Sequence, residues 1–221
     1  MKVIITGATG MVGKGVLLES LDHQSVTEVL VIGRNSVELK HPKLKEIIHS
    51  DFSSFSTVKD RLTGYDACFY CMGISSAGVK EEEFKHVTYD FTLALAKLLV
   101  KINPQMTFNY VLGEGTDSTE KGRVIWARVK GKTENDILKL GFKQAFMFRP
   151  GAIIPLRDIK SRTKLYQFIY DYFMWLIKFF KFISPNSVVN TTQLGLAMIN
   201  TVLRGYSDKI VKPKDIIALS Q

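Results

Sequence analysis

The feature that most constrains this fold is a glycine-rich loop near the start of the chain. The apolar run Lys2–Thr6 leads into the letters GATGMVG at positions 7–13, and helical periodicity follows over Val12–Leu21. Between a strand and a helix, glycines at this spacing permit a tight turn, a close backbone approach to a pyrophosphate, and close packing of the helix on the sheet. The pyrophosphate lies at the helix N-terminus, where unpaired N–H groups and the dipole favour an anion. The residues expected to form this dinucleotide-binding loop are Gly7, Thr9, Gly10, Met11, Val12 and Gly13.

Beyond this loop, short apolar runs alternate with longer segments of helical periodicity, which is the pattern of βαβ units and a parallel sheet. The expected strands are Lys2–Thr6, Glu28–Ile32, Lys45–His49, Ala67–Cys71, Met106–Leu112 and Gln144–Phe148. The expected helices are Val12–Leu21, Ser56–Leu62, Glu82–Val100 and Val124–Leu140. We therefore predict an α/β protein with a doubly wound parallel sheet, the Rossmann fold.

The rhythm of the sequence changes after Gly151. The 221 residues suit a single domain, with residues 1–151 as the Rossmann core. No further strand–helix pair is evident in residues 152–221, so we expect a small helical portion there, including a helix that starts at Thr191 and ends at Leu203. Ligands of doubly wound sheets bind beyond the carboxyl ends of the strands. This C-terminal portion is therefore expected to roof the cleft and to shape a substrate pocket.

The aromatic-rich segment Leu165–Ile183 is mostly apolar and nearly long enough to span a membrane. At 100° per residue its polar side chains fall within one arc of about 80°. These side chains are those of Gln167, Asp171, Lys178 and Lys181. Three charges within a bilayer are costly, so a half-buried roof helix is favoured over a membrane span. A homodimer contact or a weak contact with a membrane surface are the alternatives, because the apolar face is wide.

Charge and cysteine content limit which partners and which cellular compartment are expected. The net charge of +9 comes from Lys and Arg spread along the chain, so a solvated basic surface is favoured and no nucleic-acid partner is expected. The N-terminus goes directly into a strand without a signal-peptide pattern. Cys68 and Cys71 lie in one apolar strand and point to opposite faces, which favours buried structural thiols over a redox pair. We expect a cytoplasmic protein, and the four histidines show no metal-ligand spacing.

The end of the second strand distinguishes NAD from NADP. An NAD site places an acid there for the ribose 2′-hydroxyl, whereas an NADP site uses a cation for the 2′-phosphate. This chain has no acid at that point and reads Gly33-Arg34-Asn35-Ser36. Arg34 can bind the phosphate through paired N–H donors, and Asn35 and Ser36 add neutral donors. NADP is therefore favoured over NAD, and the alternative interpretation of Arg34 is an exposed loop charge.

Several short segments together resemble a known superfamily. These are the glycine-rich loop, Gly33-Arg34, Ser50-Asp51-Phe52, Cys71-Met72-Gly73, the stretch from Trp126 to Gly131, and Arg149-Pro150-Gly151. They resemble the short-chain dehydrogenases/reductases over residues 1–155. More narrowly, they are similar to an atypical branch near the Tat-interacting oxidoreductases and bacterial proteins labelled nucleoside-diphosphate-sugar epimerases.

The resemblance implies roles for residues outside the loop. Asp51 and Phe52 would lie beside the adenine, and Cys71, Met72 and Gly73 would line the central part of the coenzyme. Pro150 and Gly151 would border the nicotinamide. The alternatives are that Asp51 is a simple turn residue and that Cys71–Gly73 only pack at the end of a strand.

The catalytic pattern of the family is incomplete in this chain. The family places Tyr and Lys at i and i+4 on the helix after the fifth strand, with Ser at the end of that strand. Lys130 is present, but Trp126 holds the Tyr position and Leu112 holds the Ser position. Indole is a hydrogen-bond donor that does not titrate usefully, so the usual proton transfer is lost. Five residues are candidates to replace it: Tyr89, Glu114, Thr116, Asp117 and Ser118.

Two classes of function remain open on the sequence. An intact coenzyme loop and Lys130 favour an NADP(H)-dependent oxidoreductase of an unknown small substrate. Trp126 and Leu112 favour a catalytically degenerate protein that senses NADP(H) or binds a partner. A sugar-nucleotide epimerase is a third, less favoured interpretation, because that chemistry also uses the missing Tyr.

Overall fold

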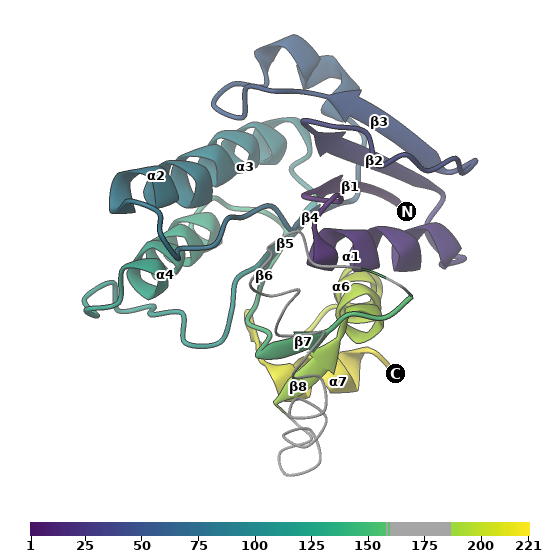
Figure 1. The fold of residues 1–221 in the computed structure, drawn as a ribbon. Coiled ribbons are helices and arrows are strands. Elements are labelled where there is room, and N and C mark those ends of the chain that lie inside the picture. The colour runs from purple at the N-terminus through teal and green to yellow at the C-terminus, as the bar shows by residue number, and fades with distance from the viewer. Residues whose placement is uncertain (158, 160–186) are drawn as a thin grey trace.

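The computed structural model describes residues 1–157, 159 and 187–221. A seven-stranded sheet lies between two layers of helices (Figure 1), and every pair of neighbouring strands is parallel. In the order β3-β2-β1-β4-β5-β6-β9, the strands are Leu44–Ile48, Glu28–Gly33, Lys2–Thr6, Ala67–Tyr70, Thr107–Val111, Gln144–Phe148 and Ile210–Val211. This architecture confirms the predicted doubly wound Rossmann fold.

The strand order reverses beside β1. The chain runs from β1 through β2 to β3 on one side, then crosses back to β4 on the other, so that Ile5 is paired with Val31 and with Phe69. In open parallel sheets such a switch point leaves a crevice at the carboxyl ends of the two central strands, because the flanking loops diverge there. The glycine-rich loop follows β1 directly and therefore lies in this crevice.

Alternating side chains of the strands face the two helical layers. Val3 and Ile5 pack toward one layer and Ile4 toward the other, as period-two strands require. The first layer contains α1 (Met11–Asp22), α6 (Thr191–Arg204) and α7 (Pro213–Leu219). The second contains the short helix η1 (Ser56–Leu62), α3 (Phe91–Ile102) and α4 (Ile125–Leu138). The predicted helix Glu82–Val100 is a continuous run of α2 (Glu81–Lys85), the π-helical turn η2 (His86–Asp90) and α3.

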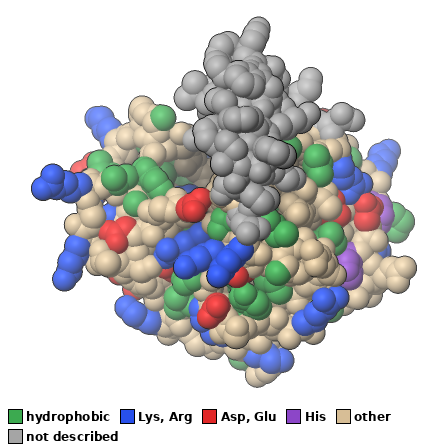
Figure 2. Space-filling model, turned by 90° about the horizontal axis from the view of Figure 1, so that it is seen from below, with side chains coloured by type: hydrophobic (Ala, Val, Ile, Leu, Met, Phe, Trp, Pro, Cys, Tyr) green, Lys and Arg blue, Asp and Glu red, His purple; other side chains and the backbone are tan. Residues whose placement is uncertain are grey.

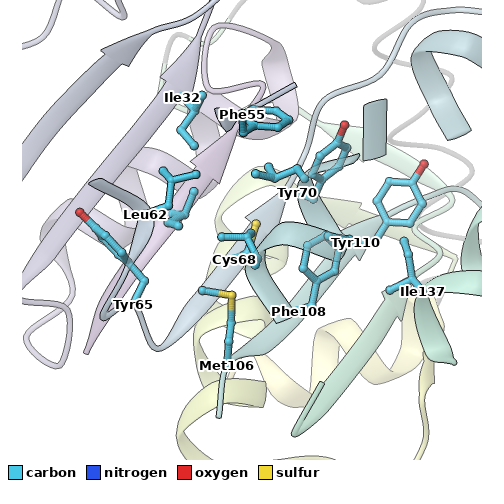
Figure 3. Packing of buried hydrophobic residues seen from close by; sticks show 14 of the residues in the cluster. Ile32, Phe55, Leu62, Tyr65, Cys68, Tyr70, Met106, Phe108, Tyr110 and Ile137 are labelled. Carbon is cyan, nitrogen blue, oxygen red and sulfur yellow. The ribbon is translucent and has the colours of Figure 1, made fainter. Parts of the chain in front are cut away.

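Aromatic side chains fill the core under the second layer. Figure 3 shows Tyr70 and Tyr110 with their hydroxyl groups on the same side of the cluster, and their ring centroids are 5.5 Å apart. Cys68 lies within this core, whereas Cys71 packs against the cluster on the opposite face of the sheet. Both thiols are free, and burial raises the pKa of each. The interpretation of the two cysteines as structural residues on opposite faces agrees with this placement.

The expectation that only helices follow Gly151 is wrong. β7 (Ala152–Ile154) pairs with β8 (Val188–Asn190) in a small parallel sheet, and β9 extends the main sheet beside β6. The Rossmann core is therefore completed by residues beyond the predicted boundary at 151. These strands have only two or three residues, which is too short for an alternating pattern to be recognised in the sequence.

Helix α6 does not roof the crevice as predicted, because it packs along α1 on one face of the sheet. Glycines at two contact points allow this close approach. A Cβ on Gly15 would lie 2.6 Å from Cβ of Thr191, and a Cβ on Gly195 would lie 2.8 Å from Cγ of Glu19. The helix starts with a capping box, in which Asn190 accepts a hydrogen bond from the Gln193 backbone N–H. The other predicted roof element, Leu165–Ile183, lies outside the described residues, together with its dimer and membrane alternatives.

The surface mixes charges of both signs. Figure 2 shows Lys and Arg side chains at separate places around the rim of one face and in one group near its centre, with acidic side chains between them. Within the described ranges, no helix has the length and apolarity needed to cross a membrane. The same residues contain no group of His, Cys, Asp and Glu side chains that could hold a metal ion.

Candidate functional site

A cleft of about 330 Å³ lies at the carboxyl ends of β1, β2 and β4. It brings together most of the residues predicted to bind a dinucleotide. These are Gly7, Thr9, Gly10, Met11, Val12, Gly13, Arg34, Phe52, Cys71, Met72 and Gly73. Its residues come mainly from the glycine-rich loop and from the ends of β2 and β4, the strands on either side of β1. We call it the coenzyme cleft.

The glycine-rich loop has the form of a cradle that a side chain would fill. Gly7 has a φ of +70°, and a Cβ there would lie 2.6 Å from the carbonyl oxygen of Cys71. A Cβ on Gly13 would lie 2.2 Å from the carbonyl oxygen of Gly7. Helix α1 then starts without a side-chain cap and without an acid in its first turn, so its first N–H groups point to an anion site. The residues present therefore fit the pyrophosphate of a dinucleotide.

The adenine end of the coenzyme cleft includes some of the predicted residues and not others. Arg34 lines the cleft, is exposed, and makes no hydrogen bond or ion pair with another residue that the structure describes. Phe52 is buried there and packs edge-on against Phe55. Asn35 and Asp51 are not among the lining residues. The Asp51 carboxylate accepts a hydrogen bond of 2.9 Å from the Ser53 backbone N–H, which is the turn role weighed as its alternative.

A second cleft, of about 520 Å³, is lined from Ile74 on, and the preceding residue, Gly73, lines the first cleft. It contains the predicted residues Trp126, Lys130, Pro150 and Gly151. Its other lining residues are Ile74, Ser75, Ser76, Phe84, Gly113, Glu114 and Ala152. We call it the substrate cleft, since it lies beside the expected nicotinamide end of the coenzyme cleft. Ser75 and Ser76 were missed in the sequence, where their place just after the fourth strand was the available signal.

Lys130 is the group of the family pattern that the chain retains. It lies on α4, and its Nζ donates a 2.8 Å hydrogen bond to the carbonyl oxygen of Leu112 at the end of β5. Burial lowers the pKa of Lys130 to about 8, because desolvation disfavours the charged amine. Leu112 itself is buried, and its backbone N–H donates to the carbonyl oxygen of Phe148. At the position where the family has a serine hydroxyl, Lys130 therefore binds the backbone carbonyl oxygen of Leu112.

Trp126 packs over the loop that follows β5. A Cβ on Gly115 would lie 3.2 Å from Cη2 of the indole, and Gly115 has a φ of +83°. A glycine at this position lets the loop pass close beneath the ring. Because indole neither accepts a proton nor releases one near neutral pH, Trp126 shapes the substrate cleft without taking part in proton transfer.

The loop after β5 contains four of the five candidate replacements for the missing tyrosine. Thr116 donates to the carbonyl oxygen of Gly113 at 2.8 Å, and Ser118 donates to Glu134 at 2.9 Å. Asp117 accepts hydrogen bonds from Thr119 and from the Gly122 backbone N–H, which hold the pKa of its carboxyl below the ordinary value. These three side chains stabilise the loop. Glu114 instead lines the substrate cleft.

The fifth candidate, Tyr89, lies elsewhere. Its hydroxyl donates to Asp136 at 2.8 Å, and it lines a separate hollow between α2 and α4. Burial and the bond to Asp136 raise the pKa of Tyr89. Of the five candidates, Glu114 is thus the one that shares the cleft with Lys130. Its backbone N–H donates to the carbonyl oxygen of Pro150 at 2.9 Å, which holds it beside the end of β6.

A buried ion pair behind the substrate cleft fixes its walls. The Arg149 guanidinium binds the Glu134 carboxylate, which is almost fully buried, and donates a further hydrogen bond to the Ser118 hydroxyl. Arg149 directly follows β6, Glu134 lies one turn beyond Lys130 on α4, and Ser118 belongs to the loop that contains Glu114. The network therefore joins the parts of the chain that supply Lys130, Glu114 and Gly151 to the cleft.

The fold and the two clefts define an NAD(P)-binding Rossmann protein of the short-chain dehydrogenase/reductase type. Residues 3–118 match the model of the NAD dependent epimerase/dehydratase family, and the chain belongs to this family. The chain is 27% identical over 154 residues to Protein HTATIP2 of Rattus norvegicus. The aligned region covers 69% of this chain and 62% of the rat protein. It is 28% identical over 157 residues to the mitochondrial Protein FMP52-2 of Scheffersomyces stipitis, covering 70% and 67%. The match thus spans less than two thirds of the rat relative. The predicted resemblance to the atypical branch is confirmed.

Solved structures with low sequence identity share the fold. The UDP-glucose 4-epimerase of Thermotoga maritima superposes with a TM-score of 0.70 at 12% identity, covering 95% of this chain and 75% of the epimerase. Bordetella bronchiseptica WbmF, solved with NAD+ and UDP, gives 0.71 at 13%, covering 96% and 71%. A short-chain dehydrogenase/reductase of Saccharomyces cerevisiae gives 0.68 at 14%, covering 99% and 97%.

Proposed function

We propose that this protein is an NADP(H)-dependent oxidoreductase that acts on a small substrate in the substrate cleft. The observation that supports this most strongly is the placement of Lys130 and Glu114 in a second cleft, whose lining begins at the residue after Gly73 of the coenzyme cleft. A coenzyme-binding loop alone would suit a sensor. A second cleft with titratable groups beside the expected nicotinamide position suits a reaction.

The coenzyme would be held by residues of both clefts. Backbone N–H groups at the start of α1 would bind the pyrophosphate, and Arg34 would bind the 2′-phosphate that distinguishes NADP from NAD. Lys130 would orient the nicotinamide ribose near Pro150 and Gly151. When bound, the nicotinamide supplies the acceptor or donor of a hydride, and the protein supplies orientation and proton transfer.

Glu114 is the group we assign to proton transfer in place of the missing tyrosine. Its carboxylate lines the substrate cleft and forms no ion pair with Lys130 or any other described residue. It can accept the hydroxyl proton of an alcohol substrate, or return a proton to a carbonyl oxygen, as carboxyl groups do in general acid–base catalysis. Because Glu114 is exposed, it can exchange that proton with water.

A second candidate function is supported by Trp126 and Leu112. With an indole and an aliphatic side chain at two family positions, the protein could bind NADP(H) as a sensor or for a partner without turnover. A sugar-nucleotide epimerase, the activity that the family name suggests, is less well supported because it also relies on the tyrosine. The two main candidates differ in whether the coenzyme reacts.

One experiment separates them. NADPH binding is measured by calorimetry, and NADPH oxidation is then followed across a broad panel of small carbonyl compounds. The proposal expects turnover in the wild type, and a loss of about 10²–10⁴-fold in kcat for Glu114→Gln with NADPH affinity retained. Tight NADPH binding without turnover, in the wild type and in Trp126→Tyr alike, would favour the sensor.

We further propose a cytoplasmic location and no nucleic-acid partner, on the basis of the charge distribution and the two free thiols. The fungal relatives are named mitochondrial, so the location needs its own test. Fractionation of cells that express the tagged protein should recover it in the cytosol. Recovery with mitochondria would contradict this part of the proposal.

A further inference from the structure

The loop that follows β2 is tied down by an acid from the neighbouring strand. Glu46 lies on β3 and is half-buried, and its Oε1 accepts a 2.8 Å hydrogen bond from the Val37 backbone N–H. Its Oε2 accepts a 2.9 Å hydrogen bond from the Ser36 hydroxyl. The Ser36 oxygen in turn accepts a hydrogen bond of 3.0 Å from the Glu38 backbone N–H. One carboxylate therefore fixes three successive residues of the loop.

This network changes the role that the sequence gives to Ser36. The hydroxyl was expected to donate to the 2′-phosphate, but its proton is used by Glu46. Arg34, two residues earlier, is left as the cationic donor on the coenzyme cleft. Arg34 itself has no partner among the described side chains, and Glu46 holds the backbone two to four residues after it.

The charge of Glu46 and its position have opposite consequences for NADPH. As a negative charge near a 2′-phosphate, Glu46 would weaken NADPH binding by repulsion. As the acceptor that holds the loop, it would strengthen NADPH binding, because a loop that is already ordered loses less entropy when Arg34 binds the phosphate. Glu46 does not line the coenzyme cleft, and its oxygens are already hydrogen-bonded to the loop. Both observations favour the positioning role.

We propose that Glu46 is a positioning residue for coenzyme specificity, which holds the loop of residues 36–38 so that Arg34 faces the 2′-phosphate of NADP. The proposal rests on the proposed NADP(H) function. In this proposal the preference for NADP over NAD depends on Glu46, although the Glu46 carboxylate does not contact the 2′-phosphate. Removing this acid should therefore weaken the binding of the phosphate.

The test compares dissociation constants of NADPH and NADH for four proteins by calorimetry. These are the wild type, Glu46→Ala, Glu46→Gln and the control Glu38→Ala. In Glu46→Ala the NADPH preference should fall by roughly tenfold, because the ligand must then order a loop that Glu46 orders in the wild type. Glu46→Gln keeps an amide oxygen for the Val37 N–H and should keep most of the preference. Glu38→Ala removes an exposed acid from the same loop and should change the preference little.

A measurement without coenzyme checks the cause. Amide hydrogen exchange at Val37 and Glu38 should be slow in the wild type and in Glu46→Gln, and faster in Glu46→Ala. A lower melting temperature with an unchanged preference would show a merely structural role and overturn the proposal. Tighter NADPH binding in both Glu46 variants would also overturn it, because charge repulsion would then be the dominant effect.

The proposed function can fail separately from this inference. If the wild type binds neither coenzyme, or prefers NADH, the NADP(H) function is wrong whatever the variants do. If NADH is preferred and both Glu46 variants lose NADH specifically, Glu46 instead serves the ribose 2′-hydroxyl, and the positioning proposal is also overturned. If NADPH is preferred and Glu46→Ala keeps that preference, only the inference about Glu46 fails.

Discussion

Arg34 is the residue on which coenzyme choice depends in this account. It lies on the coenzyme cleft, exposed and without a described partner, so a phosphate would be its first strong ligand. Arg34→Ala should weaken NADPH binding by about tenfold to a hundredfold, since hydrogen bonds to charged groups contribute roughly 1.5–3 kcal/mol. NADH binding should change by less than about threefold. Calorimetric titration of both coenzymes measures the difference.

The matched control for this prediction is Arg204→Ala. Arg204 is exposed at the opposite end of the sheet, beside Met1 and Gly205. Its substitution by Ala removes the same charge from the protein as Arg34→Ala does. Equal losses for the two coenzymes in Arg34→Ala, or a similar loss in Arg204→Ala, would show that Arg34 does not bind the 2′-phosphate.

Lys130 is retained at a cost in stability. Burial lowers its pKa to about 8 in the folded protein from the ordinary value of 10.5, so the unfolded chain binds its proton more tightly. Between these values the stability rises with pH, and below about pH 8 the burial of the charge is fully destabilising. Lys130→Met should therefore raise the free energy of unfolding near pH 7 by about 1–3 kcal/mol.

The advantage of Lys130→Met should shrink as the pH rises from about 8 toward about 10, because the amine is then neutral in the folded protein and begins to lose its proton in the unfolded chain. Urea denaturation at the two pH values measures the change, and NADPH binding of the variant should fall at the same time. A variant that is less stable than the wild type near pH 7 would show that the charged amine is stabilised in the fold.

At the scale of elements, the joint between β1 and α1 should tolerate no side chain at Gly13. A Cβ there would lie 2.2 Å from the carbonyl oxygen of Gly7, so the backbone of the loop must move. Gly13→Ala should destabilise the protein by about 1–3 kcal/mol and abolish coenzyme binding. Gly73→Ala is the control for stability, because a Cβ at Gly73 meets no atom within 4 Å. Equal stability of the two variants would contradict the close packing of α1.

The elements that the sequence predicted well are those with enough residues to show a period. The strands of the main sheet from β1 to β6 and helices α1, α4 and α6 match within a few residues. β7, β8 and β9 were missed because two or three residues carry no alternation. The place of α6 beside α1 was also missed, since it depends on the contact of Gly15 with Thr191, two residues far apart in the chain.

The residues of the candidate site also divide into those that the sequence could predict and those that depend on tertiary contacts. The glycine-rich loop could be predicted because its strand, turn and helix are contiguous, and most of its expected lining residues meet in one cleft. Glu46 could not, because it reaches Ser36 and Val37 only through the pairing of β2 with β3. Glu114 was one of five candidates, and only its tertiary position separates it from the other four.

At the scale of the whole molecule, the coenzyme should join parts of the chain that are distant in sequence. The coenzyme cleft takes residues from β1, α1, β2 and the segment after β4, so a ligand that binds only the folded state stabilises all of them together. NADPH at about 100 times its dissociation constant should add about 2.7 kcal/mol to the free energy of unfolding. The melting temperature should rise by about 5–10 °C. Thermal denaturation with and without NADPH measures this, and an unchanged melting temperature would contradict binding.

The most direct test of the account is a crystal structure of the protein grown with NADPH. We expect the pyrophosphate against the backbone N–H groups of residues 11–13, the 2′-phosphate beside Arg34, and the nicotinamide near Lys130 and Gly151. Density for the dinucleotide at any other place on the molecule would contradict the assignment of this loop as a coenzyme cradle.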